Sequence, residues 1–206
     1  MLLSRTLMTS AWVDSGGSQL QPRGMPPEIT IETDRLRFTP FAPDDFALFR
    51  DLHGDPEVQR FMSPDGLAMP EDIAREQLAR QIATQARFGF SKWKLCLKDG
   101  RFIGRAGLAP FEPTNEIELG YVLKRDMWGQ GLATEAACAV ARWAFTNLQI
   151  DHLIAFTHPE NTASRRVLTK AGMRDLGLRD MGFEQPSRVF RLDRQEIQVA
   201  VTASRS

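Results

Sequence analysis

The sequence predicts an α/β domain built around a mixed sheet, and three observations carry this prediction. Residues 117–123 alternate apolar side chains with polar or small ones, which is the two-residue period of a strand with one buried face. Residues 132–148 are apolar almost all round, which is typical of a buried helix. Strand and helix patterns then continue to alternate, and this order favours an α/β fold with a mixed sheet.

The first half of the chain divides into two strand regions and two helices. An alternating strand covers 29–38 and is broken near Thr33. A helix follows over 42–52, and a longer helix runs from Pro70 to Gly89 with an apolar residue at every fourth position. Two further strands, 93–97 and 102–108, flank an Asp-Gly pair that favours a hairpin.

The second half begins with the 117–123 strand and the WGQG loop at 128–131. The buried helix over 132–148 comes next, followed by a short strand over 153–156. A helix over 162–171 ends at a glycine, and the chain from Met173 onward resembles a final pair of strands.

The composition is that of one globular domain with tails. The 206 residues exceed the roughly 150 expected of one domain, and 42% are hydrophobic, enough for a core without disulfides or metal. Lys and Arg number 26 and Asp and Glu also number 26, so the formal charge is zero. A neutral chain lacks the charge that attracts nucleic acid or an anionic membrane, and we expect neither as a strong partner.

The two ends of the chain carry little pattern. We expect residues 1–26 to form a mobile N-terminal arm, residues 27–196 the folded domain and residues 197–206 a C-terminal tail. Arg5 interrupts the apolar start of the chain, which argues against a secretory signal. No run reaches the roughly 18 to 20 apolar residues that span a bilayer.

The cysteines and histidines predict neither a disulfide nor a metal site. Cys96 and Cys138 lie in apolar stretches, where reduced core thiols are common, and this predicts a cytoplasmic protein. The three histidines are scattered, and no metal-ligand spacing is present. A catalytic thiol is disfavoured because neither cysteine has an evident histidine partner.

The WGQG loop is the first candidate binding site. It lies directly before a buried helix, where unpaired backbone N–H groups and the helix dipole stabilise an anion such as a pyrophosphate. Gly129 and Gly131 allow the backbone to approach a phosphate closely. Thr134 replaces the third glycine of a dinucleotide fingerprint, and no GKS or GKT is present. From these residues alone, a turn that only starts the helix explains the loop as well as an anion-binding site does.

The segment ELGYVLKRDMWGQGLATEA at 118–136 resembles the acetyl-CoA-binding motif of the GNAT N-acetyltransferase superfamily, in its RimJ/RimL-like branch. Three further segments resemble that branch in order and spacing: ETDRLRFTPFAPDDF at 32–46, IGRAGL at 103–108 and PENTASRRVLTKAGM at 159–173. The resemblance implies a mostly antiparallel mixed sheet of about seven strands, flanked by about four helices. It also implies acetyl-CoA as co-substrate and is compatible with a homodimer.

The resemblance also implies where acetyl-CoA binds. Backbone amides of the loop and first helical turn would hold the pyrophosphate: Gly129, Gln130, Gly131, Leu132, Ala133 and Thr134. The pantetheine arm would run like an added strand along Tyr121, Val122 and Leu123. Trp128 stands where the family usually has Gln or Arg, which changes no backbone donor. Asn161 is expected to contact the pantetheine, although a helix N-cap also explains it.

Acetyl transfer to an amine needs a base, an oxyanion donor and a proton or hydrogen bond for the departing thiolate. Glu118, on the polar face of the central strand, is the first candidate base and Glu116 the second; both could instead be solvated strand residues. The resemblance implies a backbone N–H of Val122 or Leu123 as the oxyanion donor.

For the thiolate, many relatives use a tyrosine, but Leu168 occupies that position, and Tyr121, the sole tyrosine, is on another element. Ser164 matches the serine that the RimJ/RimL-like branch places one turn earlier, although an ordinary helix residue explains it as well.

The sequence thus predicts an acetyl-CoA-dependent N-acetyltransferase acting by direct attack of a primary amine in a ternary complex. A non-catalytic acyl-CoA-binding or sensing module and an enzyme for longer acyl groups are the alternatives. The acceptor pocket is expected at Asp55–Met69 and the C-terminal strands, bordered by Arg60, Phe61 and Met62. These residues do not indicate whether the acceptor is a protein N-terminus, an amino acid, a polyamine or an aminoglycoside.

Overall fold

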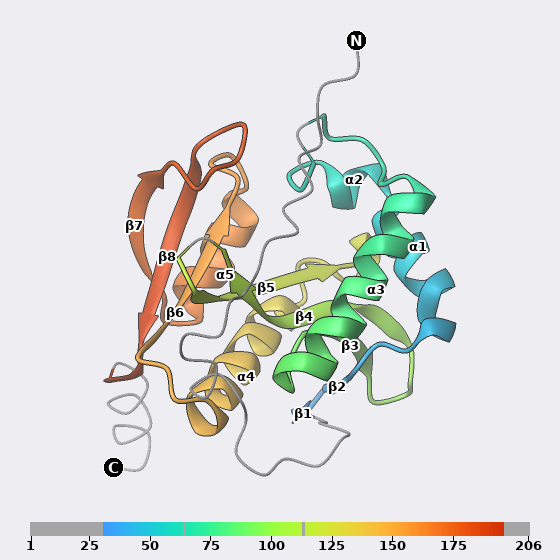
Figure 1. Ribbon diagram of the computed structural model, residues 1–206, viewed down its shortest axis with the longest axis horizontal. Helices are drawn as coiled ribbons and strands as arrows, with labels where there is room; N and C mark the ends of the chain where they lie inside the picture. The colour runs from blue at the N-terminus through green and yellow to red at the C-terminus, as the bar shows by residue number, and fades with distance from the viewer. Residues whose placement is uncertain (1–30, 64, 113, 196–206) are drawn as a thin grey trace.

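The computed structural model describes residues 31–63, 65–112 and 114–195 (Figure 1). The predicted arm at 1–26, the tail at 197–206 and both domain boundaries lie outside these residues, so they stay predictions. None of the helices in the described ranges is long and apolar enough to cross a bilayer.

One sheet of eight strands organises the chain, in the order β1-β2-β3-β4-β5-β6-β8-β7. All neighbouring strands are antiparallel except β5 and β6, which are parallel. The strands are β1 (Ile31–Glu32), β2 (Leu36–Thr39), β3 (Lys92–Leu97), β4 (Phe102–Phe111), β5 (Glu116–Leu123), β6 (His152–Thr157), β7 (Arg174–Arg179) and β8 (Ser187–Asp193). The predicted mixed, mostly antiparallel sheet is confirmed, and the break near Thr33 separates the first two strands.

Five α-helices flank the sheet, one more than the sequence predicts. They are α1 (Phe46–His53), α2 (Pro56–Gln59), α3 (Glu71–Phe88), α4 (Leu132–Asn147) and α5 (Thr162–Lys170), with 3₁₀ turns at Pro43–Asp45 and Arg125–Met127. The unpredicted helix α2 has four residues, too few for a periodic pattern. Its start is nevertheless encoded, because Asp55 accepts a hydrogen bond from the Glu57 N–H and Pro56 takes the first helical position.

Two hydrophobic cores lie on opposite faces of the sheet. Beneath α4 and α5, the larger core includes Trp93, Leu119 and Leu168. On the other face, α1 and α3 enclose a smaller core that includes Phe49 and Val122. In Figure 1, α1 and α3 lie side by side at the right, whereas β6, β7 and β8 form a wing at the left. Because strand side chains alternate, Glu118 faces the same side as Val122, away from α4.

The join between β5 and β6 positions the candidate site. Within the described residues these two strands pair only at Glu118 and Ile154. The opposite edge of β5 pairs with β4 along its whole length. Beyond Glu118, therefore, the edge of β5 that faces β6 has no strand partner. We call the region between this edge, β6 and α5 the slot, and Glu118, the last β5 residue paired with β6, lies at its apex.

Candidate active site

The open edge of β5 is the first component of the site. Residues 119–123 have no pairing with β6, so their backbone groups on that side, apart from the Leu123 carbonyl, are available to an extended ligand, which would bind as an added strand. Tyr121, Val122 and Leu123, predicted to lie along the pantetheine arm, all fall on this edge. At its end the indole of Trp128 donates to the Leu123 carbonyl at 2.9 Å, which anchors the following loop to the strand.

The second component is the N-terminus of α4. Gly131 is the N-cap residue, in the left-handed conformation with φ of 77°, and it makes no side-chain cap. The first intrahelical bond is donated by the Glu135 N–H to the Gly131 carbonyl. The N–H groups of Leu132, Ala133 and Thr134 therefore have no partner within the helix. These amides lie where the sequence predicts a pyrophosphate, and their free donors fit such an anion.

Arg35, which the sequence analysis does not identify, braces this loop. Its Nε donates to Glu135 Oε2 at 2.6 Å and its Nη1 to the Gln130 carbonyl at 2.9 Å. The Thr33 hydroxyl donates to the other Glu135 oxygen. Glu135 lies in the first turn of α4, where a carboxylate would repel a bound phosphate. Arg35 offsets that charge, although 100 residues separate the two side chains in sequence.

At the slot apex, Glu118 forms an ion pair with Lys92 of β3. The Lys92 Nζ lies 2.8 Å from Glu118 Oε2, and the two side chains are only 15% and 14% exposed. Lys92 reaches Glu118 by crossing Gly120, where an added Cβ would lie 2.9 Å from the Lys92 Nζ. Gly120 therefore provides the space for this pair. Lys92 lies in no motif of the sequence, so its place in the site was not predicted.

A buried polar network lies beside this ion pair. His53 is fully buried. Burial is the main cause that lowers its pKa to about 2, and the charges of Arg105 and Lys92 lower it further. The imidazole is therefore neutral, and its Nε2 accepts from Arg105 Nε at 3.0 Å. The amide Nε2 of Gln59 lies 2.8 Å from the other ring nitrogen, Nδ1, so both nitrogens of the buried ring have polar partners.

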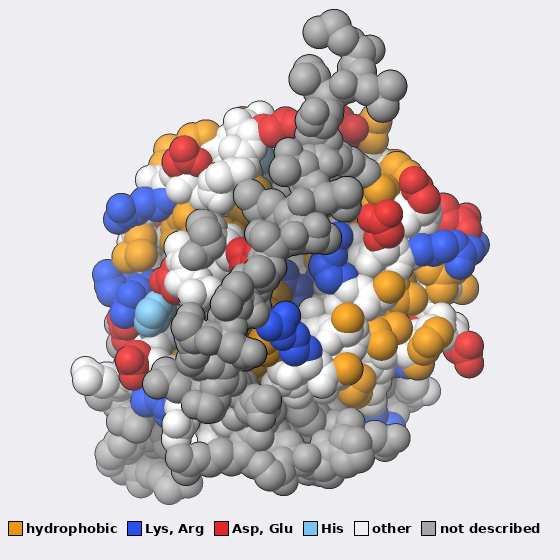
Figure 2. All heavy atoms as spheres, in the orientation of Figure 1, with side chains coloured by type: hydrophobic (Ala, Val, Ile, Leu, Met, Phe, Trp, Pro, Cys, Tyr) orange, Lys and Arg blue, Asp and Glu red, His pale blue; other side chains and the backbone are white. Residues whose placement is uncertain are grey.

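Arg105 brings a second cation to the region of Glu118. Burial lowers its pKa to about 10, against the charge of Glu118, which raises it, so Arg105 remains cationic at neutral pH. Lys92 and Arg105 thus place two positive charges on the face of the sheet that carries Glu118. The space-filling view shows basic side chains near the centre of the molecule, between its two halves (Figure 2).

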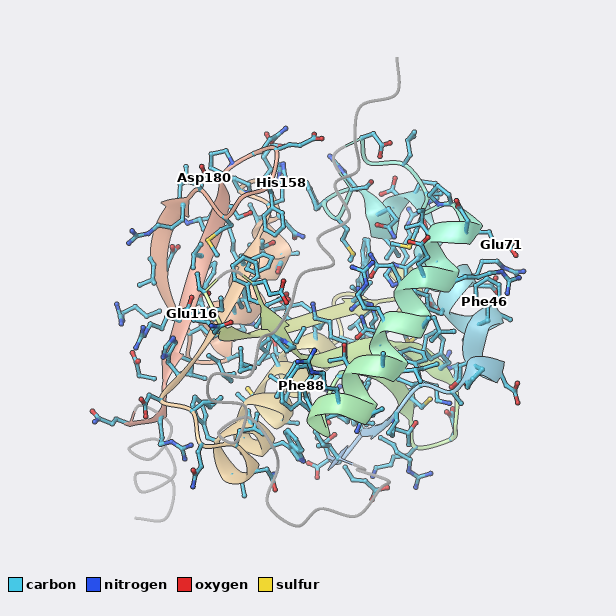
Figure 3. The ribbon with its side chains drawn as sticks, viewed as in Figure 1. Phe46, Glu71, Phe88, Glu116, His158 and Asp180 are labelled. Atoms are coloured by element: carbon cyan, nitrogen blue, oxygen red, sulfur yellow. The ribbon has the colours of Figure 1, made fainter. Side chains whose placement is uncertain are left out.

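Glu116, the second candidate base, is bonded to a different partner. Its Oε1 lies 2.8 Å from His152 Nε2. Burial raises the pKa of Glu116, but hydrogen bonds from Thr114 and His152 outweigh it and lower the pKa below its usual value. Glu116 precedes the apex of the slot and lies beside the β6 wing (Figure 3). The geometry therefore leaves Glu118 closer to the slot.

Ser164 and Tyr121 meet across the slot. The hydroxyl oxygens lie 2.9 Å apart, and the Tyr121 hydroxyl also lies 3.1 Å from the Ser164 carbonyl. Burial raises the pKa of Tyr121 to about 12, against the Ser164 hydrogen bond, which lowers it. From sequence, Tyr121 was expected away from the leaving group because it lies on a strand. Its ring crosses to α5 nonetheless, while Leu168 packs in the core.

Asn161 caps α5 through one atom only. Its Oδ1 accepts from the Ser164 N–H at 3.0 Å, so the helix N-cap interpretation is confirmed. The same bond fixes the first turn of α5, where Ser164 lies. Among the described residues, the Asn161 Nδ2 has no hydrogen-bond partner, so it remains available for the predicted contact to pantetheine.

A groove of about 550 Å³ continues the site beyond the end of β5. It is lined by Asp51, Leu52, Asp55 and Val58 from the α1–α2 region and by the turn Lys124–Asp126. Both cysteines are free and half-buried, and burial raises the pKa of Cys96 and of Cys138, so both are thiols. No cluster of three or more potential metal ligands occurs in the described ranges.

Comparisons with known proteins agree with this geometry. Residues 35–174 match the family described as "Acetyltransferase (GNAT) domain". The Bacillus subtilis (strain 168) protein YkkB is 35% identical over 147 residues, which cover 69% of this chain and 84% of YkkB. The FsC-acetyl coenzyme A-N(2)-transacetylase of Aspergillus fumigatus is 32% identical over 155 residues, which cover 70% of this chain and 64% of that protein.

A solved structure of RimL, a ribosomal L7/L12 α-N-protein acetyltransferase in complex with coenzyme A, has a TM-score of 0.69. It is 14% identical in sequence, and the match covers 80% of this chain and 98% of that chain. At this identity the likeness shows the fold, so the RimJ/RimL-like branch stays a prediction. The family itself is shown by the 35–174 match and by YkkB. The chain therefore belongs to the GNAT family of acetyltransferases, whose acetyl donor is acetyl-CoA.

Proposed function

We propose that this acetyltransferase transfers the acetyl group of acetyl-CoA to a primary amine, by direct attack in a ternary complex. The observation that carries the proposal is the open edge of β5, which has a carboxylate at its apex and free α4 amides beyond its other end. The Aspergillus fumigatus relative is named as an acetyl coenzyme A N(2)-transacetylase, which supports a nitrogen acceptor. The segment at 118–136, which resembles the motif of the RimJ/RimL-like branch, also supports transfer to a nitrogen.

The donor fits the residues of the slot. Backbone amides from Gly129 to Thr134 would hold the pyrophosphate, since those that begin α4 have no helical partner. The edge at 121–123 and the Asn161 Nδ2 would hold the pantetheine amides. When bound, acetyl-CoA supplies a thioester whose carbonyl carbon accepts the amine nitrogen and whose sulfur departs as a thiolate.

Glu118 is proposed as the base. Lys92 holds its Oε2, which fixes the carboxylate at the apex and leaves Oε1 to take a proton from the amine, directly or through a water. Among the described residues, Lys92 bonds to Oε2 and no hydrogen bond involves Oε1. A backbone N–H of Val122 or Leu123 is the proposed donor to the oxyanion. The Leu123 N–H is the one on the open edge, because the next N–H, that of Lys124, is bonded to the Ile103 carbonyl of β4 and the direction alternates along a strand.

Ser164 is proposed to donate its hydroxyl proton in a hydrogen bond to the departing sulfur. Ser164 keeps its proton for the sulfur when the single Tyr121 hydroxyl proton is donated to Ser164 Oγ at 2.9 Å in place of the Ser164 carbonyl at 3.1 Å. The resulting chain of hydrogen bonds from Tyr121 through Ser164 to the sulfur would strengthen its members. The raised pKa of Cys96 and of Cys138 argues against a cysteine nucleophile, which supports direct attack over an acetyl-enzyme.

Two measurements test the proposal in sequence. Calorimetric titration with acetyl-CoA should show binding at one site per chain, and a panel of primary amines should then yield N-acetylated product detected by mass spectrometry. Absence of binding at millimolar acetyl-CoA would contradict the proposal. Binding without product on any amine would instead favour the non-catalytic acyl-CoA-binding or sensing module.

A further inference from the structure

Three phenylalanine side chains from separate elements meet on the candidate acceptor face. Phe111 ends β4, Phe156 lies on β6, and Phe183 lies between β7 and β8. The ring centroids of Phe111 and Phe156 are 5.1 Å apart, those of Phe156 and Phe183 are 5.2 Å apart, and those of Phe111 and Phe183 are 6.3 Å apart. Phe183 is 50% exposed, so this aromatic wall is open to a ligand.

The strand register places the aromatic wall beside Glu118. Phe111 pairs with Glu116, and paired residues share a face, so Phe111 and Glu118 lie on the same side of the sheet. Glu118 lies two residues after Glu116 on β5, so Phe111 and Glu118 are offset by about 7 Å along the strand direction. Phe156 follows Ile154 by two residues, and Ile154 is the partner of Glu118. Phe111 and Phe156 are therefore each two residues, or about 7 Å, along the strands from the level of the proposed base.

A second aromatic contact extends this surface. The rings of Phe61 and His158 stack with centroids 5.3 Å apart, joining the segment after α2 to the end of β6. His158 follows Phe156 by two residues, directly after β6, and is labelled in Figure 3. Phe61, predicted to border the acceptor pocket, therefore contacts the residue that lies two positions after Phe156.

Building on the proposed function, we infer that the acceptor carries an aromatic or bulky apolar group within a few atoms of its amine. The Glu118 carboxylate suits the amine, and the neighbouring rings suit the apolar group. A polyamine or an aminoglycoside would place polar groups against these rings and lose their hydration without compensation. The same chemistry occurs in an arylalkylamine and in a peptide that begins with an aromatic residue.

Matched amines test the inference. We expect kcat/KM for 2-phenylethylamine to exceed that for ethylamine at least tenfold, because an apolar ring contributes binding energy when it leaves water. The peptide Phe-Gly-Gly compared with Ala-Gly-Gly forms the second arm. A preference in the first arm alone identifies a small-molecule acceptor, and a preference in the peptide arm identifies a chain terminus; either result supports the inference.

Variants locate the preference. Phe183→Ala should reduce the aromatic preference about tenfold, and Phe183→Leu should retain most of it, because leucine restores apolar contact. Leu178→Ala is the matched control, since Leu178 is also an exposed apolar residue, at 56%, but belongs to β7. Turnover of ethylamine and Ala-Gly-Gly without any aromatic preference would overturn the inference and leave the proposed function intact. Failure of every amine to be acetylated would overturn both.

Discussion

The hydroxyl oxygens of Tyr121 and Ser164 lie 2.9 Å apart and join β5 to α5 across the slot. The pair forms although the side chains are 43 residues apart and belong to a strand and a helix. Burial raises the pKa of Tyr121 to about 12, so the phenol keeps its proton and acts as a hydrogen-bond donor. The phenol can thus orient the Ser164 hydroxyl toward the slot.

The effects on kcat of removing the Ser164 and Tyr121 hydroxyls should not add, because the two act together. Ser164→Ala should lower kcat at least tenfold, since the departing sulfur loses its donor. Tyr121→Phe should lower kcat less, and the double variant should be no slower than Ser164→Ala, because Tyr121 acts through Ser164. Thr169→Val is the control, as it removes a hydroxyl that bonds only the Arg165 carbonyl on the same helix. Additive losses would show that the two hydroxyls act independently.

Glu118→Gln should lower kcat/KM by about 100-fold or more, the usual scale of lost general-base catalysis. The pH dependence of the remaining rate should flatten, while calorimetry shows nearly unchanged acetyl-CoA affinity. Glu116→Gln is the matched control, because its carboxylate bonds His152 outside the slot. Wild-type turnover in Glu118→Gln would remove this residue from the base role, and a selective loss in Glu116→Gln would transfer that role to Glu116.

Gly131→Ala should weaken acetyl-CoA binding. Gly131 has φ of 77°, and an alanine in this left-handed conformation raises the free energy of the loop by about 1 to 2 kcal/mol. The loop can relieve this strain only by a backbone change that moves its amides. Gly100→Ala imposes comparable strain, since Gly100 has φ of 89°, but it lies in the β3–β4 turn. Calorimetry should therefore show at least a tenfold weaker Kd for Gly131→Ala alone. Equal affinity in both variants would argue against pyrophosphate binding by this loop.

His53 should make the fold sensitive to mild acid. Its pKa falls from 6.5 to about 2 on folding, so only the unfolded chain binds this proton above pH 2. Stability is therefore retained above pH 6.5 and lost as the pH falls below it. Between pH 7.5 and 5.5 the free energy of unfolding should fall by about 1.4 kcal/mol from this group.

Urea unfolding of the wild type and His53→Gln at these two pH values checks the effect of His53. Glutamine does not titrate but can still accept a hydrogen bond from Arg105. The variant should lose this part of the pH dependence. An equal fall in both proteins would show that other groups cause it.

Much of the fold could be predicted from local pattern. Alternation identified β5, and the apolar residues of 132–148 identified α4, because both elements face the core along most of their length. Gly89 correctly marked the end of α3, where it adopts φ of 73°. Helix α2 was missed because its formation depends on Asp55 capping and Pro56 geometry, which resemble those of a simple turn.

The candidate site could be predicted only in part. Glu118, Gly131 and Ser164 carry motif signals, so sequence spacing identified them. No motif signal marks Lys92, Arg35 or Arg105, because each acts through a partner distant in sequence. Lys92, for example, acts through Glu118. The reach of Tyr121 to Ser164 likewise depends on how β5 and α5 pack. Such pairings follow from the sheet register, which a strand pattern alone does not determine.

The most direct test of the account follows the acetyl group itself. The protein is mixed with acetyl-labelled acetyl-CoA and 2-phenylethylamine, and free CoA, N-acetylated amine and labelled protein are each quantified. We expect one N-acetylated amine for each CoA released, no release without the amine, and no labelled protein. Label on the protein, or CoA release without N-acetylated amine, would contradict direct transfer to an amine.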